Sequence, residues 1–171
     1  MRRSASALFA LVFLACKGPT SASGQHATPP DFELSALDGS AQRLSEHLGK
    51  DVVLIDFWAT YCEPCLASMP HLDELYRKNK ARGFVVLGVS IDGADSLGAV
   101  RREVQQLGIS FPILLDSDTR VVALYNPKTT APYSVLIDRS GRIVQKFEGY
   151  ASGGSDELDH SVAAAVSRAA P

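Results

Sequence analysis

Two runs of apolar, largely β-branched residues constrain the fold more than any other feature of this sequence. Residues 52–57 (VVLIDF) and 84–91 (FVVLGVSI) have the pattern of buried strands, and residues 63–82 between them repeat apolar side chains at the spacing of one helix face. Gly83 follows that helical pattern and predicts its end. Strands that are apolar throughout need cover on both faces, so this order predicts a sheet with helices on either side.

The rest of the chain continues the alternation of strands and helices. The turn dipeptide at residues 38–39 (Asp-Gly) separates segments 32–34 and 42–44 and predicts a small N-terminal hairpin. The later elements that we expect are a helix over 95–107, a strand over 113–115, a short helix over 119–125, strands over 134–137 and 143–147, and a terminal helix over 155–169. Because the last two strands are joined by a tight turn, the predicted class is α/β with one mixed central sheet.

Charge and composition exclude some classes of protein. The 171 residues are 46% hydrophobic and 21% charged, as in ordinary soluble domains, and the formal net charge is -2. Removing Arg2 and Arg3 with a signal peptide leaves 15 basic against 19 acidic residues, a net charge near -4. This balance gives no electrostatic surface for nucleic acid.

The N-terminus has the layout of an export signal. Arg2 and Arg3 precede an apolar run over residues 8–15 that is too short to span a bilayer as a helix. Cys16 follows directly, and the stretch resembles a bacterial lipobox, in which the cysteine is lipidated. An ordinary signal cleaved after residues 21–23, with Cys16 discarded, is the alternative.

These patterns divide the chain into three parts. We expect a signal peptide over residues 1–15 and a flexible linker over 16–30, which is small, polar and proline-rich. The remaining residues, 31–171, are long enough for one domain with its own core.

The sequence Cys62-Glu63-Pro64-Cys65 stands between a predicted strand and the start of a predicted helix. The N-terminus of a helix carries free N–H groups and positive dipole, so the pKa of Cys62 should fall below its usual value of about 8.5. Pro64 suits the first helical turn, and the spacing places Cys65 close enough to form a disulfide. We therefore predict that Cys62 attacks a partner disulfide and that Cys65 resolves the mixed disulfide.

Three nearby residues are further candidates. A carboxylate inside an apolar strand is costly without a role, and burial should raise the pKa of Asp56, so we interpret Asp56 as the proton acceptor for Cys65. The alternative is a strand-end side chain bonded to backbone. Trp58 and Tyr61 are candidates to line the site where a client binds. For Trp58, packing in the core is an equally good interpretation.

Residues 56–65 (DFWATYCEPC), followed by Met-Pro at 69–70, resemble the thioredoxin superfamily, and more closely its TlpA/ResA-like branch of exported thiol–disulfide reductases. The resemblance continues through residues 88–92, 111–118 and 131–143 and spans residues 28–170. It implies a thioredoxin fold: a mixed central sheet flanked by helices, with an N-terminal β-hairpin extension.

The resemblance also implies roles for single residues. Pro132 matches the family's cis-proline, although cis bonds are only about 5–6% of X–Pro bonds in general. A cis-proline beside the dithiol would leave a backbone edge free to pair with a client, and Ala131 would face the cysteines without adding charge. With Glu63 and Pro64, these residues complete the expected client-binding set. Ser68 stands where the branch often has Glu, so Asp56 is expected to carry the proton alone.

The function implied is reduction of disulfides in extracytoplasmic client proteins, as in cytochrome c maturation or repair of oxidised cysteines. The anionic Glu63 beside Cys62 favours a reductant over an oxidant. The expected partners are the client and a membrane electron-donor protein, with the chain held by lipid on Cys16 at the periplasmic side of a bacterial membrane. No metal or organic cofactor is expected.

Three other functions remain open from the residues. A peroxidase of peroxiredoxin type needs Thr three positions and Pro seven positions before the attacking cysteine, and this chain has Ala59 and Ile55 there. A zinc or copper site, as in a copper chaperone, could combine the cysteines with His71, His26 or His47, although structural zinc sites usually have two ligand pairs. A lipid-tethered binding module with a structural disulfide is the third.

Four acidic residues do not have the spacing of a calcium-binding loop, and we interpret them as turn residues: Asp38, Asp92, Asp116 and Asp118.

Overall fold

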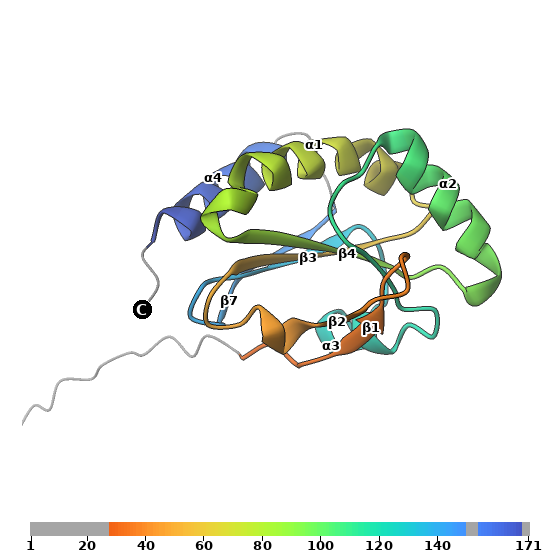
Figure 1. The fold of residues 1–171 in the computed structure, drawn as a ribbon, viewed down its shortest axis with the longest axis horizontal. Helices are drawn as coiled ribbons and strands as arrows, with labels where there is room; N and C mark the ends of the chain where they lie inside the picture. Colours follow the sequence, from red (N-terminus) through yellow and green to blue (C-terminus); the bar gives the residue numbers. More distant parts are fainter. Residues whose placement is uncertain (1–27, 150–153, 169–171) are drawn as a thin grey trace, which may run out of the picture.

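A five-stranded sheet in the order β5-β4-β3-β6-β7 forms the centre of the fold (Figure 1). The computed structural model describes residues 28–149 and 154–168. The parallel strands are β3 (Val52–Trp58), β4 (Phe84–Ser90) and β5 (Ile113–Leu115). Two antiparallel strands, β6 (Tyr133–Ile137) and β7 (Ile143–Glu148), complete the sheet on the other side of β3. The sheet is therefore mixed, as predicted.

Both faces of the sheet are covered (Figure 1). The helices α1 (Glu63–Asn79) and α4 (Gly154–Ser167) lie over one face, with α2 (Leu97–Leu107) beside α1. The opposite face carries the hairpin of β1 (Glu33–Ser35) and β2 (Ala41–Arg43), the 3-10 turn η1 (Leu44–Glu46) and the short helix α3 (Arg120–Tyr125). A bridge between Ala36 and Leu114 ties the hairpin to β5.

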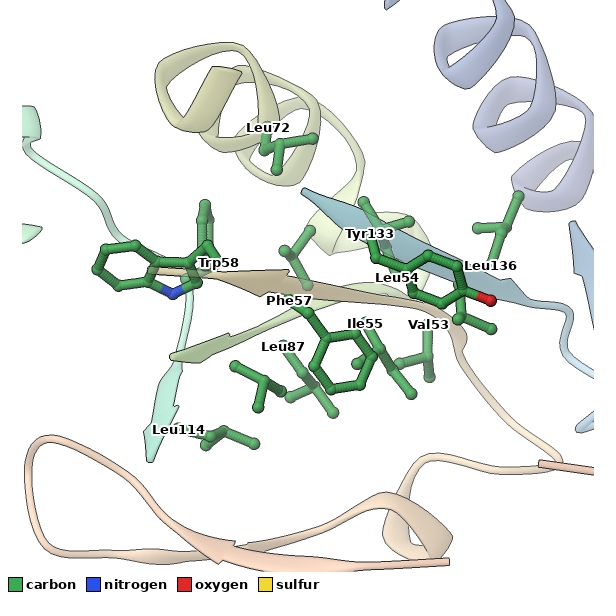
Figure 2. Close-up of a cluster of buried hydrophobic side chains, with 14 of the residues drawn as sticks. Val53, Leu54, Ile55, Phe57, Trp58, Leu72, Leu87, Leu114, Tyr133 and Leu136 are labelled. Carbon is green, nitrogen blue, oxygen red and sulfur yellow. The ribbon is translucent and has the colours of Figure 1, made fainter. Parts of the chain in front are cut away.

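Burial of β3 on both sides fixes the direction of its side chains. In Figure 2, Leu72 of α1 lies on one side of β3, whereas Phe57 and Leu114 lie on the side of the hairpin. The Phe57 ring is 5.8 Å from the ring of Tyr125 in α3. Because successive side chains of a strand point to opposite faces, Asp56 points toward the α1 face. This is the face on which α1 begins.

The helix boundaries differ modestly from those predicted. The first helix ends at Asn79, and residues 80–82 form the 3-10 turn η2 (Lys80–Arg82) before Gly83, whose φ is 73°. The second helix begins with the 3-10 turn η3 (Ala94–Ser96) and becomes α-helical at Leu97. Short 3-10 turns are common at helix ends. The other predicted elements agree to within one or two residues, and the predicted signal peptide, Cys16, linker residues up to 27 and residues 169–171 lie outside the described ranges.

The turn between β6 and β7 is held by a buried carboxylate. Asp138 accepts hydrogen bonds from the Ser140 N–H at 2.9 Å, the Ser140 hydroxyl, and the backbone N–H and guanidinium of Arg142, both at 3.2 Å. Burial alone raises the pKa of Asp138, but the hydrogen bonds from Ser140 and Arg142 together outweigh burial and lower it. Because β6 runs antiparallel to β3, this turn lies at the end of the sheet where β3 begins.

Gly88 in β4 permits a close approach of two apolar side chains. A Cβ added at Gly88 would lie 2.7 Å from Phe111 Cε2 and 2.9 Å from Ile113 Cδ1. Such distances are far inside van der Waals contact, so no larger residue fits without displacement. The glycine therefore sets how closely the segment leading into β5 packs on β4.

Candidate active site

The two cysteines lie where β3 passes into α1. After Trp58 the chain makes a turn in which Cys62 N–H donates to the Ala59 carbonyl at 3.0 Å. Cys62 is the N-cap residue of α1, and Pro64 lies in its first turn, as predicted. Cys62 and Cys65 form a disulfide with their Cα atoms 5.3 Å apart.

The two cysteines differ in exposure. Cys62 is 7% exposed, whereas Cys65 is fully buried. A disulfide exchanges when a thiolate reaches one of its sulfurs, and Cys62 is the cysteine of the pair with exposed surface from which a partner can approach. Cys65 is placed to react only with Cys62. The attacking role of Cys62 and the resolving role of Cys65 stay predictions.

Asp56 lies in the core and is bonded across the sheet. It is 1% exposed, and its Oδ1 accepts a hydrogen bond from Ser134 Oγ at 2.6 Å. Asp56 and Ser134 are direct cross-strand partners of β3 and β6. Ser134 is not among the residues predicted from the sequence, although a serine at the start of an otherwise apolar strand is as unusual as Asp56 is in β3.

A second buried carboxylate supports the turn before Cys62. Asp92 follows β4 and accepts hydrogen bonds from Thr60 N–H, from Thr60 Oγ1 and from Ser90 Oγ. The interpretation of Asp92 as a plain turn residue is therefore wrong, because the folded sheet brings the ends of β3 and β4 together. The sequence feature that could have indicated this role is the Ser-Ile-Asp segment, which places two polar residues at the end of an apolar strand.

Asp116 opens a turn, as interpreted, because its carbonyl accepts a hydrogen bond from Thr119 N–H at 2.9 Å, and its carboxylate has a second role. It is fully buried and accepts hydrogen bonds from the backbone N–H groups of Val121 and Val122, the latter at 2.8 Å, at the start of α3. Burial raises the pKa of Asp116 and outweighs the lowering effect of these hydrogen bonds. Its role is to hold α3 against the end of β5.

The residues predicted to meet a client divide into two groups. Tyr61 is 74% exposed beside Cys62, and Glu63 and Pro64 are also exposed. The Ala131–Pro132 peptide bond is cis, and both residues are half-buried. Because Tyr133 pairs with Phe57 at the end of β3, these residues stand at the same end of the sheet as the dithiol.

Trp58 does not belong to this surface. It is fully buried in the core beside β4, so it has no surface to offer a client. Its indole Nε1 is buried without a hydrogen-bond partner among the described residues. Of the two interpretations considered for Trp58, the structure agrees with core packing, because the residue still belongs to β3 and not to the loop.

Ser68 and the histidines are engaged locally. Ser68 Oγ donates to the Cys65 carbonyl at 2.8 Å, a bond within the helix that points the hydroxyl along α1. His47 Nδ1 lies 2.9 Å from Asp51, and His71 Nε2 lies 2.7 Å from Asp159 of α4. His26 lies outside the described residues. Within residues 28–149 and 154–168, no group of three or more His, Cys, Asp or Glu side chains is arranged to hold a metal ion.

Comparison with known proteins assigns the chain to a family. The family model described as Redoxin matches residues 22–166. The chain belongs to the Redoxin family. The thiol–disulfide oxidoreductase ResA of Geobacillus kaustophilus is 38% identical to this redoxin over 122 residues, which are 71% of the chain and 68% of ResA.

Solved structures agree with this assignment. A putative thiol:disulfide interchange protein DsbE from Chlorobium tepidum is 32% identical to this redoxin with a TM-score of 0.74, covering 81% of the chain and 95% of that protein. A secreted Mycobacterium tuberculosis disulfide oxidoreductase homologous to Escherichia coli DsbE is 25% identical with a TM-score of 0.68, covering 78% and 95%. The redoxin therefore has the predicted thioredoxin fold and is a thiol–disulfide oxidoreductase.

Proposed function

We propose that this protein is an exported reductant that opens disulfide bonds in extracytoplasmic client proteins. The observation that carries the proposal is the disulfide at the N-terminus of α1, in which Cys62 is 7% exposed and Cys65 is fully buried. Cys62 is then the residue that reacts with the client, and Cys65 is the residue that reacts with Cys62.

In the reduced protein, the Cys62 thiolate attacks one sulfur of a client disulfide. A Cys62–client bond forms, the client disulfide breaks, and one client thiolate leaves. The Cys65 thiolate next attacks Cys62 Sγ, which forms the Cys62–Cys65 disulfide and releases the second client thiolate. Two electrons have passed to the client, and the structure corresponds to the oxidised product. A membrane electron-donor protein returns two electrons to the pair.

Asp56 accepts the proton of Cys65 in this scheme. Bulk water does not reach Cys65, so a buried acceptor is needed when its thiol becomes a nucleophile. Asp56 points toward the α1 face from β3, and its carboxylate is oriented by the Ser134 hydroxyl. The expected consequence is that Asp56→Asn slows release of the mixed disulfide more than it slows its formation.

The client lies across the end of the sheet, between the α1 N-terminus and the loop before β6. Tyr61, Glu63 and Pro64 contribute exposed surface on one side of Cys62, and Ala131 with Pro132 contributes the other. An extended client segment pairs with the backbone there, and Tyr61 supplies apolar contact area. The small Ala131 leaves room for the client sulfur.

The direction of electron flow follows from local charge. Glu63 places an anion in the first turn of α1, which offsets part of the stabilisation that the helix dipole gives to a thiolate. A less stable thiolate makes the dithiol a better reductant. Equilibrating the protein with defined thiol buffers should give a reduction potential near or below about -270 mV, the value of thioredoxin, whereas a value near about -120 mV, that of DsbA, would overturn the proposal.

The location rests on the N-terminal segment and on the secreted relative from Mycobacterium tuberculosis. Within the part of the chain that the structure describes, no helix is long and apolar enough to cross a membrane. We place the protein on the periplasmic side of a bacterial membrane, attached by lipid on Cys16. Labelled fatty acid should enter the wild type and not Cys16→Ser, which should move to the soluble fraction. Equal behaviour of both proteins would favour cleavage after residues 21–23.

The peroxidase alternative gains no support from this site. Ala59 and Ile55, which occupy the positions of the peroxidatic Thr and Pro, are both fully buried apolar side chains. Neither offers a hydroxyl group to a peroxide at the attacking sulfur. The copper-chaperone and binding-module alternatives are tested by the Cys65 variant described in the Discussion.

A further inference from the structure

Asp92 is the centre of a buried hydrogen-bond network that joins β4 to the turn carrying the dithiol. Its Oδ2 accepts from Thr60 N–H at 3.0 Å and from Ser90 Oγ at 2.8 Å, and its Oδ1 accepts from Thr60 Oγ1 at 2.5 Å. Asp92 is 4% exposed and Ser90 is fully buried. One carboxylate thus holds both the backbone and the side chain of Thr60.

Thr60 is two residues before the attacking sulfur. It lies inside the turn closed by the bond from Cys62 N–H to the Ala59 carbonyl. Fixing Thr60 therefore fixes the approach of the chain to Cys62. Because consecutive Cα atoms are about 3.8 Å apart, the Asp92 carboxylate lies within about 12 Å of the Cys62 backbone.

The charge of Asp92 is not balanced by a cation. Its partners are two hydroxyl groups and one amide, and none of the ion pairs formed within residues 28–149 and 154–168 involves it. Buried charges are usually paired, so this carboxylate departs from the general rule. Hydrogen bonds to both of its oxygens offset the cost of burial without cancelling the charge.

We infer that Asp92 is a positioning residue that holds the turn before Cys62, and that its negative charge disfavours the Cys62 thiolate and so keeps the dithiol reducing. The reduced protein carries a thiolate and the disulfide form does not. A fixed anion nearby therefore raises the free energy of the reduced form and favours transfer of two electrons to a client. The inference rests on the proposed dithiol exchange but on no particular client.

The size of the effect follows from the distance. At about 12 Å and an effective dielectric constant of about 20, one charge changes a neighbouring ionisation constant by up to about tenfold. Asp92→Asn should therefore increase the thiolate fraction of Cys62 about three- to tenfold at a pH below its pKa. Above the pKa of Cys62, where the reduced protein carries the thiolate, a tenfold change in the redox equilibrium corresponds to about 30 mV toward more positive potential.

The experiment compares Asp92→Asn with the wild type by the pH dependence of Cys62 alkylation and by equilibration with thiol buffers. Asparagine can keep an acceptor toward Thr60 and a donor toward Ser90, so it removes charge with little change of shape. Thr60→Val keeps the charge and removes one bond, and should shift the potential by less than Asp92→Asn. Asp138→Asn, a buried carboxylate at the opposite end of the sheet, should leave both readouts unchanged.

Three results would overturn the inference: no shift in a folded Asp92→Asn protein, an equal shift in Asp138→Asn, or a shift toward more negative potential. Asp92→Ser removes the same charge with a smaller side chain and has the same expected outcome if the asparagine variant does not fold. The wild-type potential tests the proposed reducing function, whereas the difference between variant and wild type tests Asp92. Failure of one is therefore distinguishable from failure of the other.

Discussion

Replacing Ser134 with alanine should weaken the fold at the site itself. The substitution removes the 2.6 Å hydrogen bond to the buried Asp56 carboxylate and leaves a methyl group of nearly the same size. A hydrogen bond to a charged group contributes about 1.5–3 kcal/mol to the free energy of unfolding. A domain of about 140 residues unfolds with an entropy of about 0.3 kcal/mol/K, so the melting temperature should fall by about 5–10 °C.

Thermal unfolding followed by circular dichroism, at pH 7 and with the disulfide oxidised, measures this difference. Ser40→Ala is the matched control, because Ser40 Oγ donates to Asp38 at 2.7 Å on the exposed β1–β2 turn. The control should melt within about 2 °C of the wild type, as surface substitutions usually do. If Ser134→Ala also melts within that interval, the cross-strand bond does not stabilise the fold and the argument for an oriented Asp56 fails.

Three further predictions concern the dithiol, the packing of β4 and the response to acid. Cys65→Ser should accumulate a mixed disulfide with a client that dithiothreitol releases, whereas a structural staple or a copper site would lose stability or metal without trapping one; non-reducing gels and mass spectrometry decide. Gly88→Ala should lower the free energy of unfolding by about 1–3 kcal/mol in urea, since the new methyl group meets Phe111 at 2.7 Å, and an unchanged urea midpoint would contradict this packing. The lowered pKa of Asp138 means that its contribution to stability is present above the unfolded-state value of about 3.9 and is lost as pH falls through the folded value. Asp138→Asn should therefore be less stable than the wild type at pH 7, with the gap closing below about pH 4; a gap independent of pH would show that the charge is not involved.

Local sequence pattern was sufficient for the frame of this fold. Two continuous apolar runs indicated β3 and β4, and the helical spacing of apolar residues between them indicated α1. The dithiol lies at the boundary between the first run and the helix. Gly83 ends the helical region because its backbone there is left-handed, a conformation that glycine adopts without strain. Such features depend on a residue and its near neighbours, so the sequence contains them.

The hydrogen-bonded support of the site could not be predicted in the same way. Ser134 meets Asp56 only through the register of β6 on β3, and Thr60 meets Asp92 only because β4 ends beside β3. The periodicity of a sequence indicates on which side of a strand or helix a side chain lies. It does not indicate which side chain, distant in the sequence, will contact it. Trp58 shows the converse: its nearness to the motif in sequence left a client-facing role and core packing equally open, and its complete burial agrees with core packing.

The burial of Cys65 also has a consequence for the order of events in the proposed turnover. In the proposed cycle, the client and the electron donor both bond to Cys62, since it is the one residue of the pair with exposed surface. The two partners therefore exclude each other, and the protein alternates between them in a double-displacement cycle. Steady-state rates should give parallel double-reciprocal lines, and an excess of either partner should inhibit the reaction by occupying the wrong redox form.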